Sequence, residues 1–389
     1  MTEQNETEKL LREYWNFVIK PTLKIPIGSF NFSNSDNEGY PRPPLSYKNY
    51  QRSDYYYNGK NTFFHYTPSM HNVLNILNEG YIRMSDISLL DDPQELIFAG
   101  KSILTASDKN EFKKMKSRTF CFSMCKKDNF DMWRLYGNNG WGAALVFKFL
   151  PDFKKGKNSF VSKIYYNDKK KLKVFDNLVK LHKEFFTSNN LLIKENFWEE
   201  PNKILAWISI FLAFHKTSLY KNENEVRFLK FDFNDFTYKK LGCKIGKDFT
   251  EVRYYKLPII TKENLEIIAT EKLVEELILK AKINSIKSSV DSDHTKETAQ
   301  TIEKLHQIKN NFKNKLFTIN YKEDEKLIQE ILGNSEPIIL IEKILLGYRY
   351  TDDEFRKIEN SLTKSLARRT GFKIEIERTP LAEQFHPKR

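Results

Sequence analysis

The chain of 389 residues is poor in the residues that mark several specialised classes of protein, with 3 cysteines, 14 glycines and 13 prolines. Three cysteines cannot all pair, and Cys121 with Cys125 lacks a second Cys or His pair at zinc-finger spacing, so neither a disulfide scaffold nor a zinc finger is expected. Cysteine usage of this kind favours a reducing cytoplasm. A content of 40% apolar and 30% charged residues excludes collagen and extended disorder and is enough for a sizeable core.

Long hydrophobic runs are also absent. The strongest apolar run, residues 204–214 (ILAWISIFLAF), is about half of the ~20 residues that a membrane span needs. It is expected to belong to a buried helix. The N-terminus, MTEQNETEKL, is polar and acidic, unlike a signal peptide. A cytoplasmic protein without membrane contact is therefore predicted.

Several catalytic motifs are missing as well. The segment 137–142 (GNNGWG) has the spacing of neither a Walker A loop nor a GxGxxG fingerprint, and there is no GxSxG elbow or His-Glu-x-x-His motif. A P-loop enzyme, a Rossmann dehydrogenase, a serine hydrolase and a zinc hydrolase are not supported. The net charge of +13 favours contact with a polyanion, although lysines on solvated faces are an alternative explanation.

The patterns along the chain predict an α+β protein with four parts. An N-terminal helix, Thr7–Lys20, stops at Pro21 and leads into an irregular arm, Ser33–Asp54; together they make up residues 1–60. The main α+β domain occupies 61–260 and resumes at 336–389, and residues 261–335 form a helical insertion rich in Lys and Glu. Strands are expected at Thr62–Tyr66, Tyr81–Met84, Arg118–Ser123, Ala143–Phe149, Val161–Tyr166, Glu225–Phe231, Val252–Leu257, Ile338–Leu346 and Lys373–Glu377. Helices are expected at Ser69–Asn78 (closed by Gly80), Lys169–Thr187, Lys203–Tyr220 and Asp352–Thr370.

The most informative stretch is Phe63–Met84, in which His65 ends a strand, Thr67 follows, and a short helix, a glycine and a second strand come next. This order resembles the opening of the ADP-ribosyltransferase superfamily, including poly-ADP-ribose polymerases and DNA-modifying toxins of the DarT type. The resemblance implies a split β-sheet that binds NAD. His65 would then bind the adenosine ribose, the backbone of Tyr66 would hold nicotinamide, Thr67 would support the turn, and Tyr81 is a candidate for the second-strand tyrosine. A satisfied core histidine is the alternative for His65.

A second stretch, Arg118–Phe149, places Ser123 just past a strand and Trp133 and Tyr136 one helical turn apart. Aromatic rings three residues apart share a helix face and could stack on a nucleobase or on nicotinamide. They could equally be core residues.

A third stretch, Lys216–Phe231, brings Glu223, Glu225 and Arg227 to one face of a strand by their spacing of two. Cleavage of NAD passes through a ribosyl cation, which a carboxylate stabilises. By the same resemblance Glu225 would be the catalytic residue, with Glu223 as the alternative and Arg227 as an orienting partner or phosphate ligand. Cross-strand salt bridges on an exposed strand are the other interpretation.

Six short stretches occur in an order similar to a bacterial family, domain-of-unknown-function 2971. They are HisTyrThr (65–67), LeuAspAspProGlnGlu (90–95), CysPheSer (121–123), TrpArgLeuTyrGly (133–137), GluAsnGluValArgPhe (223–228) and IleGluLysIleLeuLeuGly (341–347). The resemblance implies an accessory or effector protein of bacterial defence.

Together these features predict an NAD-dependent ADP-ribosyltransferase-like or NAD-hydrolysing effector of anti-phage defence, abortive infection or a toxin system, acting on nucleic acid or protein. One alternative is a non-catalytic sensor whose helical insertion contacts a defence partner. Another is a metal-dependent nuclease that uses Asp91, Asp92 and Glu95, which capping of a helix start explains equally. The enzyme hypothesis requires His65 and Glu225 to meet around one dinucleotide.

Overall fold

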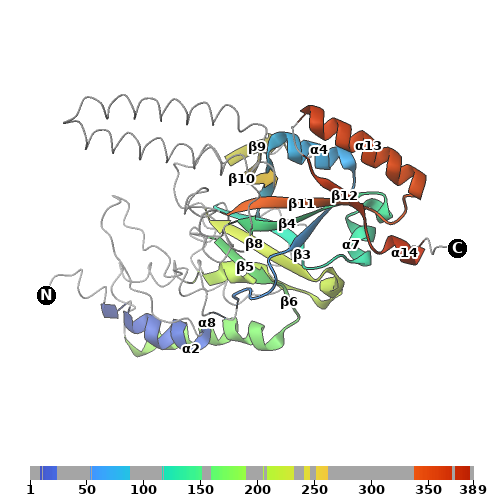
Figure 1. The fold of residues 1–389 in the computed structure, drawn as a ribbon. Coiled ribbons are helices and arrows are strands. Elements are labelled where there is room, and N and C mark those ends of the chain that lie inside the picture. Colours follow the sequence, from blue (N-terminus) through green and yellow to red (C-terminus); the bar gives the residue numbers. More distant parts are fainter. Residues whose placement is uncertain are drawn as a thin grey trace, which may run out of the picture. The chain divides into compact units, whose positions relative to one another are not determined.

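A computed structural model describes the structure of residues 9–10, 12–23, 53, 55–87, 116, 118–150, 159–189, 205, 208–231, 241–245, 251–261, 337–369 and 373–385. These residues form a mixed α+β structure, which confirms the predicted class (Figure 1). The chain divides into two compact units: Met1–Tyr66, Ile82–Leu135 and Phe153–Leu257 form the first, and Thr67–Tyr81, Tyr136–Asp152 and Pro258–Arg389 the second. Except for Ser53 and Thr261, the predicted arm (33–54) and helical insertion (261–335) lie outside the described residues.

The sheet of the first unit is organised around β3 (Thr119–Cys125). On one side β3 pairs antiparallel with β8 (Glu225–Phe231), which pairs in turn with β5 (Ser159–Lys163). On the other side β3 pairs with β1 (Phe63–Thr67) only at Phe64↔Cys125 and with β2 (Tyr81–Asp86) at two positions. β8 lies between two partner strands, and all seven of its residues, including Glu225 and Arg227, are buried, so both of its faces are covered.

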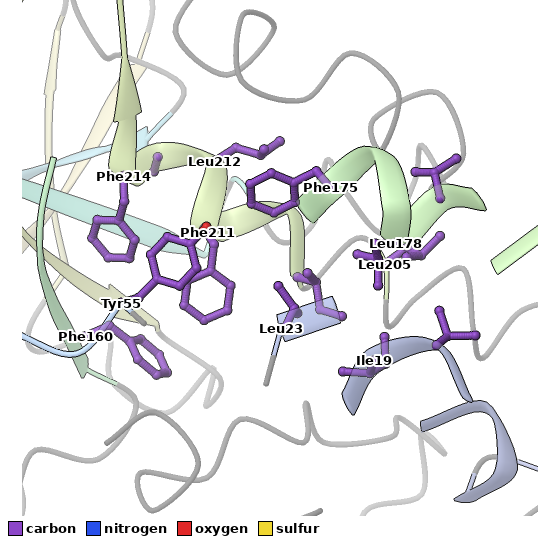
Figure 2. Packing of buried hydrophobic residues seen from close by; sticks show 14 of the residues in the cluster. Ile19, Leu23, Tyr55, Phe160, Phe175, Leu178, Leu205, Phe211, Leu212 and Phe214 are labelled. Carbon is purple, nitrogen blue, oxygen red and sulfur yellow. The ribbon is translucent and has the colours of Figure 1, made fainter. Parts of the chain in front are cut away.

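The core of the first unit joins the N-terminal helix to α8 (Lys169–Ser188) and to the apolar run before β7 (His215–Lys216). Figure 2 shows Tyr55 and Phe211 within it; their rings stack with centroids 4.7 Å apart. Complete burial of such side chains contributes ~1.5–3 kcal/mol each, so this core anchors the segment that leads to β7.

The predicted end of the N-terminal helix at Pro21 is wrong. The helix passes through a π-helical turn, η1 (Trp15–Ile19), and continues as α2 (Lys20–Leu23). The wider turn changes the hydrogen-bond register just before the proline, since the Lys20 N–H donates to the Trp15 carbonyl. Pro21 then stands in a first helical turn, where a missing N–H is tolerated.

The predicted helix over Lys203–Tyr220 is also wrong beyond Phe214. A 3-10 helix, η6 (Ser209–Phe214), ends there, the chain becomes extended at β7, and a second 3-10 helix, η7 (Ser218–Glu223), precedes β8. In a continuing α-helix the Ala213 carbonyl would accept from residue 217, but here it accepts from Arg227 at 2.6 Å. A buried guanidinium therefore takes the acceptor that the helix would need.

Two smaller differences concern strands. The expected strand Val161–Tyr166 is interrupted at Ile164, whose N–H donates to the Glu225 carbonyl, so that β6 (Tyr165–Tyr166) pairs instead with β7. An unpredicted strand, β9 (Leu241–Ile245), pairs antiparallel with β10 (Glu251–Thr261). The other predicted strands and helices that fall within the described residues agree with the structure within about four residues at their ends.

The second unit contains a βαβ motif, as the sequence predicts. Strand β11 (Ile338–Leu346) is followed by α13 (Asp352–Arg369) and by β12 (Glu375–Arg378), which pairs parallel with β11. β4 (Ala143–Leu150) is antiparallel to β11, and the last residues of β10 are parallel to it. The other elements of this unit are α4 (Met70–Glu79), η3 (Asn138–Gly140) and α14 (Ala382–Phe385). In the first unit, α7 (Phe130–Leu135) follows β3.

The described helices include none with the length and apolar character required to span a membrane.

Two glycines of the second unit have positive φ for different reasons. Gly80 (φ +73°) ends α4, and a Cβ there would meet no atom within 4 Å. Gly140 (φ +89°) lies against Tyr348, whose ring would be 2.5 Å from a Cβ. Gly140 is thus constrained both by its backbone conformation and by a close approach, whereas Gly80 is constrained by conformation alone.

We therefore expect Gly140→Ala to destabilise the protein much more than Gly80→Ala. The matched control, Gly80→Ala, should lower the free energy of unfolding by about 1–2 kcal/mol, as expected for a left-handed residue with a Cβ. Gly140→Ala should add a further steric cost of about 1–3 kcal/mol because the Tyr348 ring must move. Urea unfolding of both variants measures the difference, and equal losses would contradict the packing argument.

Candidate functional site

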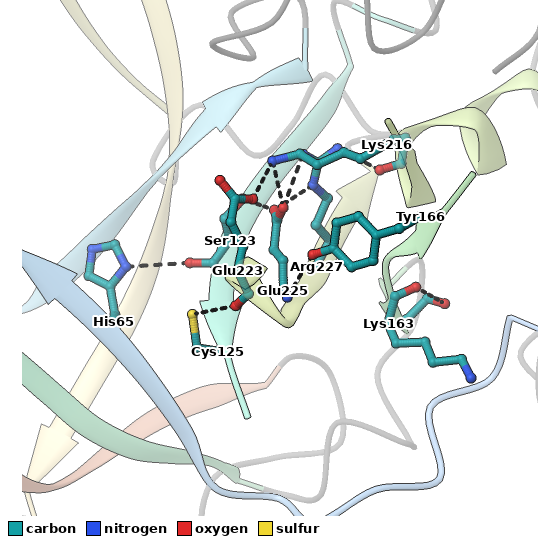
Figure 3. A network of polar contacts seen from close by, with 11 residues as sticks. His65, Ser123, Cys125, Lys163, Tyr166, Lys216, Glu223, Glu225 and Arg227 are labelled. Atoms are coloured by element: carbon teal, nitrogen blue, oxygen red, sulfur yellow. Dashed lines mark hydrogen bonds and ion pairs between the residues drawn. The ribbon is translucent and has the colours of Figure 1, made fainter. Parts of the chain in front are cut away.

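The first unit holds a cluster of four buried charged side chains, defined by Lys216, Glu223, Glu225 and Arg227 and called here the charge cluster. Lys216 comes from β7, Glu223 ends η7, and the other two residues stand on β8. Two carboxylates are balanced by two cations, so the charge cluster is electrically neutral. Figure 3 shows the four side chains converging.

Glu225 has polar contacts with three side chains. Its Oε1 accepts from Arg227 Nε at 2.7 Å and from the Ser123 hydroxyl at 2.5 Å, and its Oε2 lies 2.7 Å from Lys216 Nζ. Burial by itself raises the pKa of this carboxyl, but the charges and hydrogen bonds of Arg227 and Lys216 outweigh it and hold the pKa well below its ordinary value. Glu225 is therefore ionised throughout the physiological range.

Ser123 connects the charge cluster to the surface. It is the only exposed residue of β3, the other six being buried. Its hydroxyl donates to Glu225, and its backbone carbonyl is 3.4 Å from His65 Nδ1. In Figure 3, the imidazole and the Glu225 carboxylate lie on either side of Ser123. The two residues that the enzyme hypothesis pairs thus both contact one residue of the intervening strand.

His65 is half-buried, and its ring packs against Phe122 with centroids 4.9 Å apart. Loss of water around the imidazole lowers its pKa to about 4, and the bond to the Ser123 carbonyl only partly opposes this. The ring is therefore neutral at pH 7. Since a carbonyl only accepts, Nδ1 carries the proton and Nε2 is left as a hydrogen-bond acceptor.

The remaining predicted residues take several positions. Tyr66 is buried; its hydroxyl donates to Asp128 Oδ1 at 3.0 Å, and Trp133 Nε1 donates to the same oxygen at 2.7 Å. The Thr67 hydroxyl donates to the Ser69 carbonyl at the start of α4, and Tyr81 is the first, partly buried residue of β2. The shared helix face predicted for Trp133 and Tyr136 is wrong, because α7 ends at Leu135; Trp133 is fully buried, while Tyr136 is 39% exposed.

Glu223 also differs from expectation. The sequence predicts it on the strand with Glu225, but it lies at the end of η7, and Asn224 follows in the left-handed conformation (φ 47°). Its carboxylate still reaches the charge cluster, since Lys216 Nζ donates to its Oε2 at 2.9 Å. The spacing therefore predicted that the side chains of Glu223, Glu225 and Arg227 belong to one cluster. It did not predict the turn at Asn224 that brings Glu223 there.

Sequence reasoning missed Lys216, the residue that both carboxylates share. The predicted helix over Lys203–Tyr220 would have kept it away from β8. The available signal was a lysine two residues after the end of an apolar run and seven residues before the first of two glutamates. Among the described residues, no three His, Cys, Asp or Glu side chains are grouped as a metal site requires, and Asp91, Asp92 and Glu95 lie outside those residues.

Arg227 should be essential to stability. It is 1% exposed and bonds both Glu225 and the Ala213 carbonyl, so Arg227→Met leaves two buried carboxylates with one cation. We expect a loss of about 3–5 kcal/mol in the free energy of unfolding. The matched variant Arg134→Met, at an exposed ion pair with Asp131, should lose less than about 1 kcal/mol. Urea denaturation checks both; equal stability of the two variants would refute a structural role for the charge cluster.

Residues 132–228 match the family model described as "Protein of unknown function (DUF2971)". The matched region contains all four members of the charge cluster, whereas His65 and Ser123 precede it. No curated protein and no solved structure matches the chain significantly. The match confirms, over residues 132–228, the resemblance to domain-of-unknown-function 2971 that the ordered sequence motifs predict.

Proposed function

We propose that the first unit is an ADP-ribosyltransferase-like catalytic unit that cleaves NAD and transfers ADP-ribose to a macromolecule or to water. One observation carries the proposal: exposed Ser123 contacts both the ionised Glu225 and the neutral His65. A polar molecule that reaches the Ser123 hydroxyl from solvent would be next to a buried negative charge.

This arrangement suits cleavage of the nicotinamide–ribose bond. Nicotinamide leaves with the bonding electron pair, positive charge develops on the ribose, and the acceptor then adds while losing a proton. A carboxylate that stays ionised stabilises that cation, and its fixed orientation avoids reorganisation during the reaction. Arg227 and Lys216 keep Glu225 ionised and fixed.

The neutral His65 suits recognition of a sugar. Its unprotonated Nε2 can accept a hydrogen bond from a ribose hydroxyl, while Nδ1 remains engaged with the Ser123 carbonyl. A cationic imidazole would instead repel the developing positive charge. The low pKa of His65 is therefore compatible with this chemistry.

Stability alone does not account for the charge cluster. Burying ion pairs costs several kcal/mol per ion in desolvation, and apolar side chains of similar size often stabilise a fold as well or better. Buried groups with strongly shifted pKa values next to an exposed polar residue are typical of functional sites. The proposal extends to the setting that the resemblances imply, an effector of bacterial defence or a toxin, and the net charge of +13 favours a nucleic-acid acceptor over a protein acceptor.

We expect the purified protein to release nicotinamide from NAD and Glu225→Gln to reduce this release by about 100-fold or more, the scale at which one transition-state charge contact acts. Glu223→Gln is the matched control, because Glu223 contacts Lys216, whereas the Ser123 hydroxyl donates to Glu225. It should keep activity within about tenfold. Thermal midpoints of both variants must be compared, so that a folding defect is not read as lost catalysis.

The outcomes separate the candidates. Loss of activity in Glu223→Gln alone would assign the catalytic role to Glu223. Absence of nicotinamide release from the unmodified protein would favour the second candidate, a non-catalytic sensor or partner-binding module. The 4% exposure of Glu225 and its three bonded partners favour that candidate, because a scaffold needs no access to the carboxylate.

A further inference from the structure

We propose that Lys216 is the positioning residue of this site: by holding Oε2 of Glu225 together with the Glu223 carboxylate, it directs Oε1 of Glu225 to the exposed Ser123. The inference rests on the proposed function and adds a residue to it. Neither the family match nor the sequence motifs give Lys216 a role.

The two oxygens of Glu225 have different partners. Lys216 Nζ is 2.7 Å from Oε2, while Ser123 Oγ and Arg227 Nε are 2.5 and 2.7 Å from Oε1. Arg227 reaches Oε2 only at 3.5 Å. The ammonium therefore supplies the short contact that fixes Oε2, and a carboxylate with Oε2 fixed presents Oε1 to the Ser123 hydroxyl.

The same ammonium neutralises a second acid. Lys216 Nζ is 2.9 Å from Glu223 Oε2, so one cation is shared by two carboxylates. Without it, Arg227 would face both acids alone, and two buried carboxylates at close range tend to share a proton rather than both ionise. While Glu223 is present, Lys216 thus helps Glu225 to remain negatively charged as well as oriented.

The backbone holds Lys216 in place. β7 pairs parallel with β6, and the Lys216 carbonyl accepts from the Asn167 N–H at 3.0 Å. The side chain is 9% exposed and passes over the Tyr220 ring, with Nζ 5.0 Å from its centroid. An ammonium fixed at both ends of its side chain can act as an orienting group rather than as a mobile counterion.

The titratable and charged groups around Glu225 come from every element packed on it: Arg227 on β8, Lys216 on β7, Glu223 on η7, Cys125 on β3 and Tyr166 on β6. Burial and the neighbouring carboxylates raise the pKa values of the Cys125 thiol and the Tyr166 hydroxyl. Both stay neutral across the range tested below. A change in pH dependence after replacing Lys216 therefore reports on the two carboxylates.

The test compares full-length wild type, Lys216→Met, Lys216→Met/Glu223→Gln and the exposed control Lys180→Met, using nicotinamide release from NAD between pH 6 and 8.5. For wild type and Lys180→Met we expect a flat pH profile, that is, a kcat that does not change over this range. Lys216→Met should lower kcat by about tenfold or more, with KM changed by less than about twofold, and its kcat should fall further toward pH 6 as the acid pair takes up a proton. The double variant should regain the flat profile, because only one acid remains beside Arg227, while its kcat stays below that of Glu223→Gln.

Thermal unfolding gives a readout that needs no turnover. A carboxyl whose pKa is raised in the folded state contributes stability to the protein that is lost as the pH rises through that pKa. The thermal midpoint of Lys216→Met should therefore fall further below that of the wild type at pH 8.5 than at pH 6. The double variant should show no such difference between the two pH values. If Lys216→Met does not fold, the charge-balanced double variant must fold and show the flat profile.

Three results would overturn the inference: wild-type kcat in Lys216→Met, a flat profile in that variant, or the same pH dependence in the single and double variants. A wild-type protein that releases no nicotinamide would instead refute the proposed function.

Discussion

The neutralisation of Glu225 inside the first unit is the constraint on which the rest of the site depends. A buried carboxylate is tolerated only with cations and hydrogen-bond donors around it, and here Arg227, Lys216 and Ser123 provide them. These partners come from three separate segments of the chain, β8, β7 and β3. The charge cluster thus constrains how these segments are placed around it.

The clearest effect is on the segment before β8. An apolar run that reads as a helix ends at Phe214, because Arg227 takes the Ala213 carbonyl and Lys216 must turn inward to meet two acids. The change to an extended backbone at β7 forms the short parallel pairing with β6. Long-range electrostatics therefore outweighs local helix propensity at this point.

Much of the site follows from spacing alone. Glu225 and Arg227 are two residues apart on a strand, and period-2 geometry puts them on one face, where they pair at 2.7 Å. The position of Ser123 near the end of β3 is also close to the sequence prediction. The inward position of Lys216 and the left-handed conformation of Asn224, which redirects Glu223, were not predicted. Both depend on contacts with side chains from other segments of the chain.

Local sequence was sufficient to predict the α+β class, the limits of strands such as β8 and β11, the helix α4 closed by Gly80, and the identities of the acids and the arginine. These features depend on local periodicity and on single residues with special backbone freedom. The folded chain was needed to show that His65 and Glu225 both contact Ser123, and that one lysine serves two carboxylates. Such contacts are set by strand pairing between distant segments; Ser123 and Glu225, for example, are 102 residues apart along the chain, and no local pattern encodes which strands become neighbours.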